Sequence, residues 1–300
     1  MLAIADLKRL MTPILRTAVS DAEVTIEVNP GDVTYEYLHA LRKIGFNRLS
    51  MGVQSFNDTL LQRIGRRHTA TQAHEAVQIA QEAGFRNISI DLMYGLPEQT
   101  LAMVHWDVMT ALSLGVQHIS TYCLSYEDGT PMTLMRDKGE IQETDEETLN
   151  RMFDNYDTVL SANGWEHYEV SNFALPGYRS RHNSSYWTDI PYIGLGAGAH
   201  SYDGQKRWSN KPDLEAYISG AEQHIFPREE EVLTDEQQRE ERIMLGLRTK
   251  EGIAPIWLQG KEQAAERWIE KGLLYRTATG NIAATLQGWH ILNTIIVDLI

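Results

Sequence analysis

The sequence contains one cysteine, fewer basic than acidic residues, and no long apolar run. The single cysteine, Cys123, excludes an intrachain disulfide and any cysteine-cluster metal site built from this chain alone. No apolar run approaches the roughly 20 residues that a membrane-spanning helix needs. The chain has 27 Lys and Arg against 41 Asp and Glu, a formal net charge of −14. This balance argues against a general nucleic-acid binder, because phosphate binding relies on clustered basic residues.

The first segment, Met1–Val19, does not have the composition of a signal peptide. Its apolar residues recur at helix spacing, which predicts an amphipathic helix. Four charged residues interrupt it: Asp6, Lys8, Arg9 and Arg16. We therefore expect a cytoplasmic protein without a membrane span.

One sequence pattern that leads from a helix into a strand occurs four times along the chain. It consists of a helix-like segment, a Gly, one bulky apolar residue, two mostly polar residues and a strand. The copies are Gly45–Gly52, Gly84–Asp91, Gly115–Tyr122 and Gly164–Ser171. Gly ends a helix in the left-handed conformation, and strands separated by helical patterns indicate parallel βαβ units. A fifth strand, Glu23–Asn29, precedes the copies. The fold class predicted is α/β, built on a parallel, barrel-like sheet.

The helices between these strands have recognisable beginnings. Thr34 and Thr69 precede helical patterns as N-caps. Two further helices are expected over Thr100–Leu114 and Thr144–Asn163, the latter with an acidic first turn that suits the helix dipole.

The pattern changes after the fourth copy to an aromatic and glycine-rich region, and again after Pro212 to charged helical sequence. We expect a barrel domain over residues 1–205 and a small, mainly helical domain over 206–300. Its last part, from Trp268 onward, indicates a helix, a hairpin and a helix, an arrangement compatible with a winged helix.

Polar residues lie at or just beyond the carboxyl ends of the strands of the predicted sheet, where parallel β/α folds build ligand sites. They are Glu27, Gln54, Asp91, Ser125 and Ser171, with Arg66 in the loop after Gln54. Each carboxylate alone has an ordinary explanation as a helix cap or a buried hydrogen-bond partner. Two carboxylates, an amide and a guanidinium together suit a ligand with hydroxyls, an ammonium and a carboxylate.

The glycine-rich region leaves two interpretations open. Gly194, Gly196 and Gly198 alternate along an expected strand, which permits either close approach to a flat ligand or tight strand packing. His182 and His200 bracket the region. A histidine among aromatic rings can ligate heme iron, although a lone histidine in a loop is more often a simple hydrogen-bonding residue.

Five stretches resemble one family. EVTIEVNP from Glu23, NRLSMGVQSF from Asn47, DLMYGLP from Asp91, HNSSYW from His182 and GLGAGAHS from Gly194 are similar to radical SAM proteins related to oxygen-independent coproporphyrinogen III oxidase. The resemblance covers nearly the whole chain, in the family's order. It is closest to the branch regarded as heme chaperones.

The resemblance implies a partial (β/α) barrel with a small C-terminal domain. It also implies S-adenosylmethionine contacts at six positions: Glu27, Gln54, Arg66, Asp91, Ser125 and His200. His182, which opens the HNSSYW stretch, becomes the candidate heme ligand by the same resemblance.

The sequence departs from the family at its beginning. The family holds a 4Fe-4S cluster with a CxxxCxxC motif after its first strand and follows its second strand with a GGGTP turn, and neither is present here. Cys123 lies on a later strand and does not replace that motif. We expect that the first two β/α units are missing, that the chain is a truncated portion of a longer protein, and that it lacks radical chemistry.

Three functions follow as hypotheses. The first is the C-terminal portion of a radical SAM heme chaperone, which binds heme and S-adenosylmethionine and delivers heme to a client protein. The second is an enzyme, oxygen-independent coproporphyrinogen III oxidase, which converts two propionates to vinyl groups. The third is a heme-binding module without a redox cofactor.

Overall fold

The computed structural model describes residues 2–300, and the chain divides into two compact units, Met1–Ser180 and Arg181–Ile300. Each unit has its own cluster of buried apolar side chains. The segment that contains His182 and His200 therefore packs with the second unit. A domain boundary after residue 205 stays a prediction.

A six-stranded sheet organises the first unit, with the strand order β1-β2-β3-β4-β6-β5. Its strands are β1 (Thr25–Val28), β2 (Arg48–Gln54), β3 (Ile88–Tyr94), β4 (His118–Cys123), β5 (Glu166–Glu169) and β6 (Asn172–Ala174). The helices are α1 (Ile4–Thr17), η1 (Pro30–Asp32), α2 (Tyr35–Ile44), α3 (Asp58–Arg63), α4 (Ala70–Glu82), α5 (Leu101–Ser113), α6 (Pro131–Asp137) and α7 (Glu146–Ala162). The first four strands pair in parallel, which confirms the α/β fold class.

Threonine side chains cap four of these helices, α2, α4, α5 and α6. Thr34 accepts a hydrogen bond from the backbone of Tyr37 at the start of α2. Thr69 forms a capping box with Gln72 at the start of α4, and Thr100 caps α5. The caps expected at Thr34 and Thr69 are therefore confirmed, because each side chain satisfies a backbone N–H that the helix leaves unpaired.

The glycine that precedes each repeated strand has the expected conformation. Its φ is 125°, 94°, 66° and 79° at Gly45, Gly84, Gly115 and Gly164. The bulky residue that follows it is buried in every copy: Phe46, Phe85, Val116 and Trp165. The repeat in the sequence thus corresponds to one local structure, a helix end covered by an apolar side chain.

The fourth copy does not extend the parallel series as expected. β5 follows Gly164, but β6 lies between it and β4 and is antiparallel to both. Only Val170 and Ser171 separate β5 from β6. A link this short joins antiparallel strands alone, because a parallel neighbour requires a crossover of a dozen or more residues.

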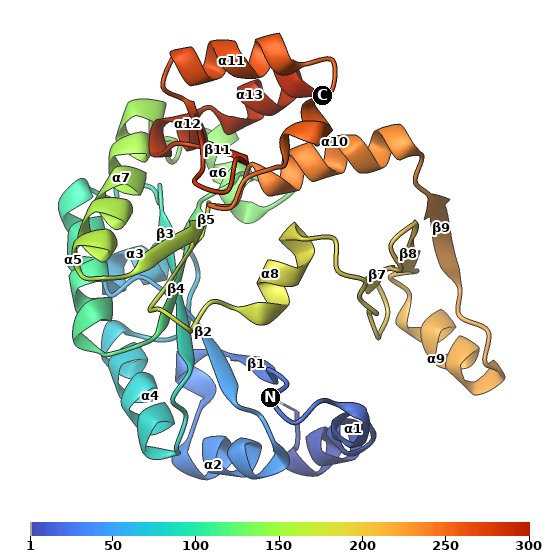
Figure 1. Ribbon diagram of the computed structural model, residues 1–300. Coiled ribbons are helices and arrows are strands. Elements are labelled where there is room, and N and C mark those ends of the chain that lie inside the picture. The colour runs from blue at the N-terminus through green and yellow to red at the C-terminus, as the bar shows by residue number, and fades with distance from the viewer. Residues whose placement is uncertain (1) are drawn as a thin grey trace. The chain divides into compact units, whose positions relative to one another are not determined.

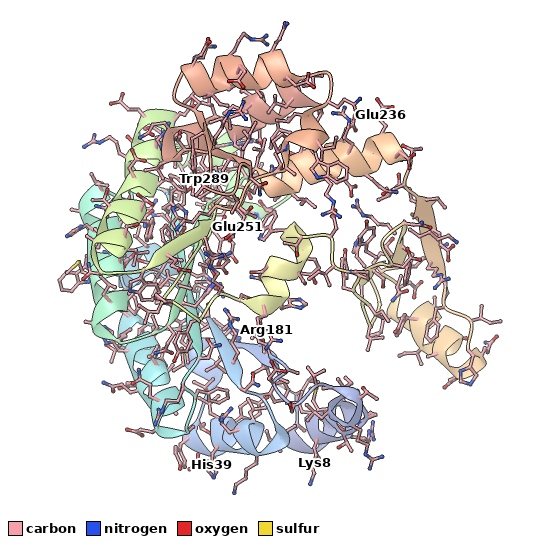
Figure 2. The ribbon with its side chains drawn as sticks, in the orientation of Figure 1. Lys8, His39, Arg181, Glu236, Glu251 and Trp289 are labelled. Atoms are coloured by element: carbon pink, nitrogen blue, oxygen red, sulfur yellow. The ribbon has the colours of Figure 1, made fainter. Side chains whose placement is uncertain are left out.

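The two faces of the parallel sheet differ in polarity. Leu49, Met51 and Ile90 are fully buried in the apolar cluster that the helices cover, and Figure 1 shows α4, α5 and α7 along that side. Lys8 on α1 and His39 on α2 lie on the outside of the helical layer (Figure 2). Because side chains alternate along a strand, the residues between the buried ones face the other side.

The second unit combines a small sheet with helices. Its elements are α8 (Arg181–Trp187), β7 (His200–Tyr202), β8 (Lys206–Asn210), α9 (Leu214–Gln223), β9 (Arg228–Val232), α10 (Asp235–Gly246), η2 (Pro255–Leu258), α11 (Glu262–Glu270), β10 (Leu274–Arg276), β11 (Ile282–Ala284), α12 (Leu286–His290) and α13 (Leu292–Leu299). The helix, hairpin and helix expected near the end are α11, the β10–β11 pair, and α12 with α13. The β7-β8-β9 sheet was not expected from the sequence.

Two expectations for the glycine-rich region are wrong. His182 lies in helix α8, not in a loop. Gly196 and Gly198 have φ of 114° and 73°, which belong to a turn and not to a strand. A Cβ on Gly194 would lie 2.1 Å from the carbonyl oxygen of His200, so the absence of a side chain permits close backbone packing there.

No helix within residues 2–300 is long and apolar enough to cross a membrane.

Candidate cofactor site

Polar side chains from four neighbouring strands share one face of the first unit's sheet. Glu27 on β1 lies opposite Ser50 on β2, and Asp91 on β3 lies opposite Ser120 on β4. Oγ of Ser50 donates to Oδ1 of Asp91 at 3.5 Å. Glu27, Asp91 and the two serines therefore face the side of the sheet that the helices leave uncovered.

Asp91 is a carboxyl group in a poorly solvated position. Burial raises its pKa to about 6, and a hydrogen bond with Ser120 acts in the opposite direction. The nearby charge of Glu27 raises the pKa further, while that of Arg48 lowers it. A cation or a hydroxyl donor at this position would favour the ionised form, because it would replace the lost solvation.

Gln54 and Arg66 meet over Gly52. A Cβ on Gly52 would lie 2.9 Å from Nε2 of Gln54 and 3.3 Å from Nη2 of Arg66, so both side chains occupy the space next to the glycine. Gln54 is 7% exposed. Nη1 of Arg66 donates to Oδ1 of Asn29 at 3.3 Å. An amide and a guanidinium are thus held together at the carboxyl ends of β1 and β2.

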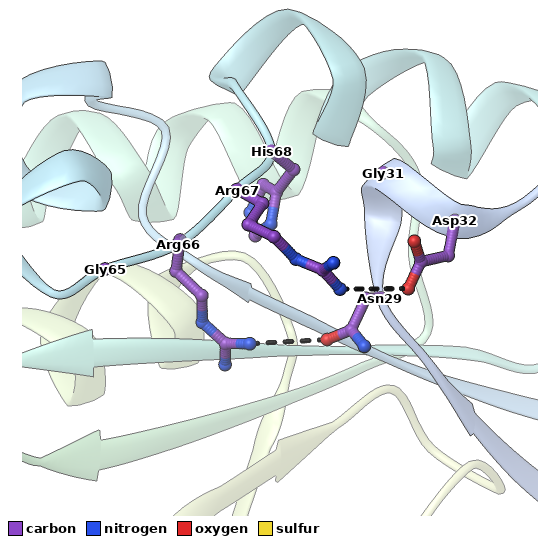
Figure 3. A pocket seen from close by; sticks show the side chains of 7 residues that line it. All are labelled: Asn29, Gly31, Asp32, Gly65, Arg66, Arg67 and His68. Atoms are coloured by element: carbon purple, nitrogen blue, oxygen red, sulfur yellow. Dashed lines mark hydrogen bonds and ion pairs between the residues drawn. The ribbon is translucent and has the colours of Figure 1, made fainter.

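A cavity of about 140 Å³ opens beside this pair (Figure 3). It is lined by Asn29, Gly31, Asp32, Gly65, Arg66, Arg67 and His68. Nη2 of Arg67 lies 3.9 Å from Oδ2 of Asp32, and Nε2 of His68 lies 3.0 Å from the carbonyl oxygen of Val53. Asn29, Gly31 and Asp32 follow the parallel strand β1, at the end where such sheets bind ligands, whereas Gly65 to His68 form the loop between α3 and α4.

Ser125 is less closely associated with the other candidates. It lies just beyond the end of β4 and is exposed. Within residues 2–300, no hydrogen bond joins it to Glu27, Gln54, Arg66 or Asp91. Ser171, expected at a strand end, lies in the turn between β5 and β6, where its carbonyl oxygen accepts from the backbone of Thr121 at 2.7 Å.

The two candidate histidines belong to the second unit. His200 is the exposed first residue of β7 and pairs with Ser209 of β8. His182 is exposed on α8, and its Nε2 lies 3.0 Å from the hydroxyl of Tyr186. The rings of His182 and Tyr186 meet edge to face, with 5.0 Å between their centroids. The rings of Tyr186 and Tyr192 meet in the same way, with 4.7 Å between their centroids. Their convergence with the residues of the first unit stays a prediction.

Several polar residues of the uncovered face were not singled out from the sequence. Tyr122 has a raised pKa, first through burial and then through the charges of Asp91, Glu169 and Glu27. Burial also raises the pKa of Glu169 to about 7, against hydrogen bonds from Asn172 and Ser171. The pairs Ser89 and Asp91, and Ser120 and Tyr122, have the period of two that marks one face of a strand. That period was the signal available in the sequence.

The thiolates of a 4Fe-4S cluster are not provided by this chain, whose one cysteine, Cys123, is exposed at the end of β4. Within the part of the chain that the structure describes, no three His, Cys, Asp or Glu side chains are grouped to hold a metal ion.

Comparisons with known proteins identify relatives across most of the chain. Residues 2–108 match the radical SAM superfamily. The heme chaperone HemW of Bacillus subtilis is 39% identical over 302 residues, which cover 94% of this chain and 78% of the relative. The heme chaperone HemW of Lactococcus lactis is 41% identical over 256 residues, covering 84% of this chain and 67% of the relative.

A solved structure extends this likeness to the fold. The coproporphyrinogen III oxidase HemN of Escherichia coli, described as a radical SAM enzyme, has a TM-score of 0.80 with this chain at 21% identity. The superposition covers 99% of this chain and 74% of HemN. Both the parallel sheet and the helices that follow it are thus of the radical SAM type.

Proposed function

The chain belongs to the heme chaperone HemW family of radical SAM proteins, and from this premise we propose that it binds S-adenosylmethionine with its first unit and heme with His182. The observation that carries the first part is the meeting of Gln54 and Arg66 over Gly52. We propose that the role of the whole protein is to deliver heme to a client protein.

The chemistry of S-adenosylmethionine fits the residues of the first unit. Its carboxylate suits Arg66, which forms charge-assisted hydrogen bonds with carboxylates. Its ammonium and ribose hydroxyls suit the acceptors Glu27 and Asp91, and Gln54 supplies both a donor and an acceptor. Ser125 and His200 are proposed contacts on the resemblance alone.

When S-adenosylmethionine is bound beside a reduced 4Fe-4S cluster, it supplies the radical chemistry of the superfamily. Cys123 is the one cysteine of this chain, so the chain does not itself provide the three thiolates that such a cluster takes. We therefore propose binding of the cofactor without radical chemistry in these 300 residues. That they are part of a longer protein is a separate prediction, which the upstream nucleotide sequence tests through a CxxxCxxC motif.

Heme binding rests on His182 and its aromatic neighbours. An exposed imidazole can reach an iron atom, and the rings of Tyr186 and Tyr192 offer apolar surface for a porphyrin. The relatives at 39% and 41% identity are named heme chaperones, which favours heme binding over porphyrinogen oxidation.

Two titrations of the purified chain test the proposal. Heme is added to the wild type and to His182→Ala, with His224→Ala as a matched control at another exposed histidine of the second unit. We expect His182→Ala to weaken heme binding about tenfold or more and to change the Soret band. An unchanged titration would remove His182 from the site.

S-adenosylmethionine is titrated by calorimetry into the wild type and into Arg66→Ala. We expect the substitution to weaken binding about tenfold or more, because it removes the guanidinium that lies beside Gln54 and that we propose binds the carboxylate of S-adenosylmethionine. If heme binds but S-adenosylmethionine does not, the chain is the heme-binding module of the third hypothesis. Formation of protoporphyrinogen by the chain would instead support the oxidase.

A further inference from the structure

Gln54 has an unusual backbone conformation. Its φ is 69°, a left-handed value that residues with a side chain rarely adopt. The backbone N–H of Ser55 donates to the carbonyl oxygen of Val53 at 2.9 Å. A hydrogen bond from residue i+2 to residue i, with positive φ between them, defines the rare and strained form of γ-turn. This turn directs the side chain of Gln54 toward Arg66 over Gly52.

A carboxyl group on helix α5 holds the residues that follow Gln54 in this turn. Oδ2 of Asp107 on α5 accepts from Oγ of Ser55 at 2.7 Å, and Oδ1 accepts from the backbone N–H of Phe56 at 2.7 Å. The two residues that directly follow Gln54 are therefore bound to one side chain. On the residue before Gln54, the carbonyl oxygen of Val53 forms a hydrogen bond with the ring of His68.

Asp107 stands in an apolar environment. It is fully buried on the face of α5 that also carries the core residues Val104, Val108 and Ala111. Burial raises its pKa to about 6, although the hydrogen bonds from Phe56 and Ser55 oppose this shift. An apolar residue at this position would pack without that desolvation penalty. The carboxyl group therefore serves the turn and not the core.

We propose that Asp107 is a positioning residue, which holds the strained turn at Gln54 through Ser55 and Phe56 and so keeps the Gln54 side chain beside Arg66. The inference rests on the proposed S-adenosylmethionine site for its functional consequence. That the turn depends on Asp107 does not require the site to bind S-adenosylmethionine. Strain of this kind persists where the surroundings over-determine it, and it gathers at ligand sites.

The test compares four variants of the full chain with the wild type: Asp107→Asn, Ser55→Ala, the double variant, and Val108→Ala. Asn has nearly the shape of Asp, but it is uncharged and presents one acceptor oxygen, so it can accept from only one of the two donors, Ser55 Oγ and Phe56 N–H. Val108 is the next residue of α5 and is also fully buried. It is the matched control, since its truncation weakens the core without touching the turn.

Two quantities are measured for each variant. The first is the rate of amide hydrogen exchange at Ser55 and Phe56, and the second is the affinity for S-adenosylmethionine. We expect Asp107→Asn to raise the rate of exchange about tenfold and to lower the affinity about tenfold, because neither donor then bonds to a charged carboxylate. Ser55→Ala should have a smaller effect, and the double variant no more than Asp107→Asn. Val108→Ala should lower the melting temperature and leave both readings at the wild-type level.

Local exchange decides the inference. If Asp107→Asn leaves exchange at Ser55 and Phe56 as Val108→Ala does, the inference is overturned, whatever happens to the affinity. If the wild type binds no S-adenosylmethionine while Asp107→Asn loosens the turn, the proposed cofactor site fails and the role of Asp107 in the turn is supported. Should Asp107→Asn not fold, Ser55→Ala gives the same two readings from a change that removes only a hydroxyl.

Discussion

Nε2 of His118 lies 2.8 Å from the hydroxyl oxygen of Tyr168, and the other ring nitrogen lies 2.7 Å from Oγ of Ser89. All three side chains are buried, and the hydroxyl of Tyr168 also accepts from the backbone N–H of Ser180 at 3.4 Å. A chain of hydrogen bonds thus joins β3, β4 and the β5 hairpin across the polar face of the sheet. Its members depend on one another, because a buried polar group left without a partner is costly.

Replacing His118 by Asn should destabilise the first unit by about 2 kcal/mol at neutral pH, since one bridge between Ser89 and Tyr168 is lost. Burial lowers the pKa of His118 well below 6.5. As the pH falls below about 6.5, the unfolded chain therefore takes up the proton first, and the stability that His118 contributes is lost. The difference between wild type and variant should shrink at acidic pH.

Urea unfolding near neutral pH and near pH 5 measures this difference. A difference that stays constant across that range would show that the imidazole is not held neutral by the fold.

Replacing Asp91 by Asn should have the opposite pH dependence. Its folded pKa of about 6 lies above the ordinary 3.8, so the wild-type carboxyl contributes stability at low pH that is lost as the pH rises through about 6. We expect the variant to be more stable than the wild type by about 1 kcal/mol above that pH, and to have no advantage near pH 4. Binding of S-adenosylmethionine should weaken.

Chemical denaturation at the two pH values checks the first part, and calorimetry checks the second. A variant that is stabilised equally at both pH values would contradict the assignment of the buried charge to Asp91.

Replacing Gly52 by Ala should weaken binding of S-adenosylmethionine about tenfold with little loss of stability. The new methyl group would lie 2.9 Å from Nε2 of Gln54 and 3.3 Å from Nη2 of Arg66. Both are ends of flexible side chains, so they move and the fold does not. Isothermal calorimetry and thermal unfolding give the two values.

Gly84→Ala is the control for this prediction. Gly84 has a φ of 94°, and a Cβ added there would meet no neighbouring atom within 4 Å, so the substitution should cost about 1 kcal/mol of stability and leave binding unchanged. If both variants weaken binding equally, the space over Gly52 has no special role.

Replacing Tyr186 by Phe should strengthen heme binding about fivefold, because one hydrogen bond that competes for Nε2 of His182 is removed. The aromatic ring next to His182 is retained. A heme titration followed at the Soret band measures the change against the wild type and His182→Ala. Weakening as large as that of His182→Ala would instead make the Tyr186 hydroxyl part of the heme site.

The sequence was informative where structure depends on neighbours in the chain. Gly45 and Gly84 end helices and Thr34 and Thr69 begin them, because caps and left-handed glycines act within one turn of the helix. The apolar period of two in β2 likewise set its buried face. The family stretches contain Glu27, Gln54 and Asp91, and the binding roles of these residues stay predictions.

The sequence was uninformative where a short segment joins a sheet or changes its conformation. β6 has three residues, and its place between β4 and β5 follows from pairing on both sides. α8 consists of a polar and aromatic stretch without an apolar period, so its helical state was not recognised. Neither segment carries a periodic signal long enough to predict its structure.

Composition and local pattern by themselves determined the α/β class and the ends of several helices of the first unit, and composition shows that the chain has one cysteine. Only the tertiary structure decided which polar groups meet. Gln54 adopts its left-handed turn beside a carboxyl group whose bond to Ser55 joins residues 52 positions apart. Such a contact depends on the register of strands and the packing of α5 against them, and no interaction between near neighbours in the chain specifies it.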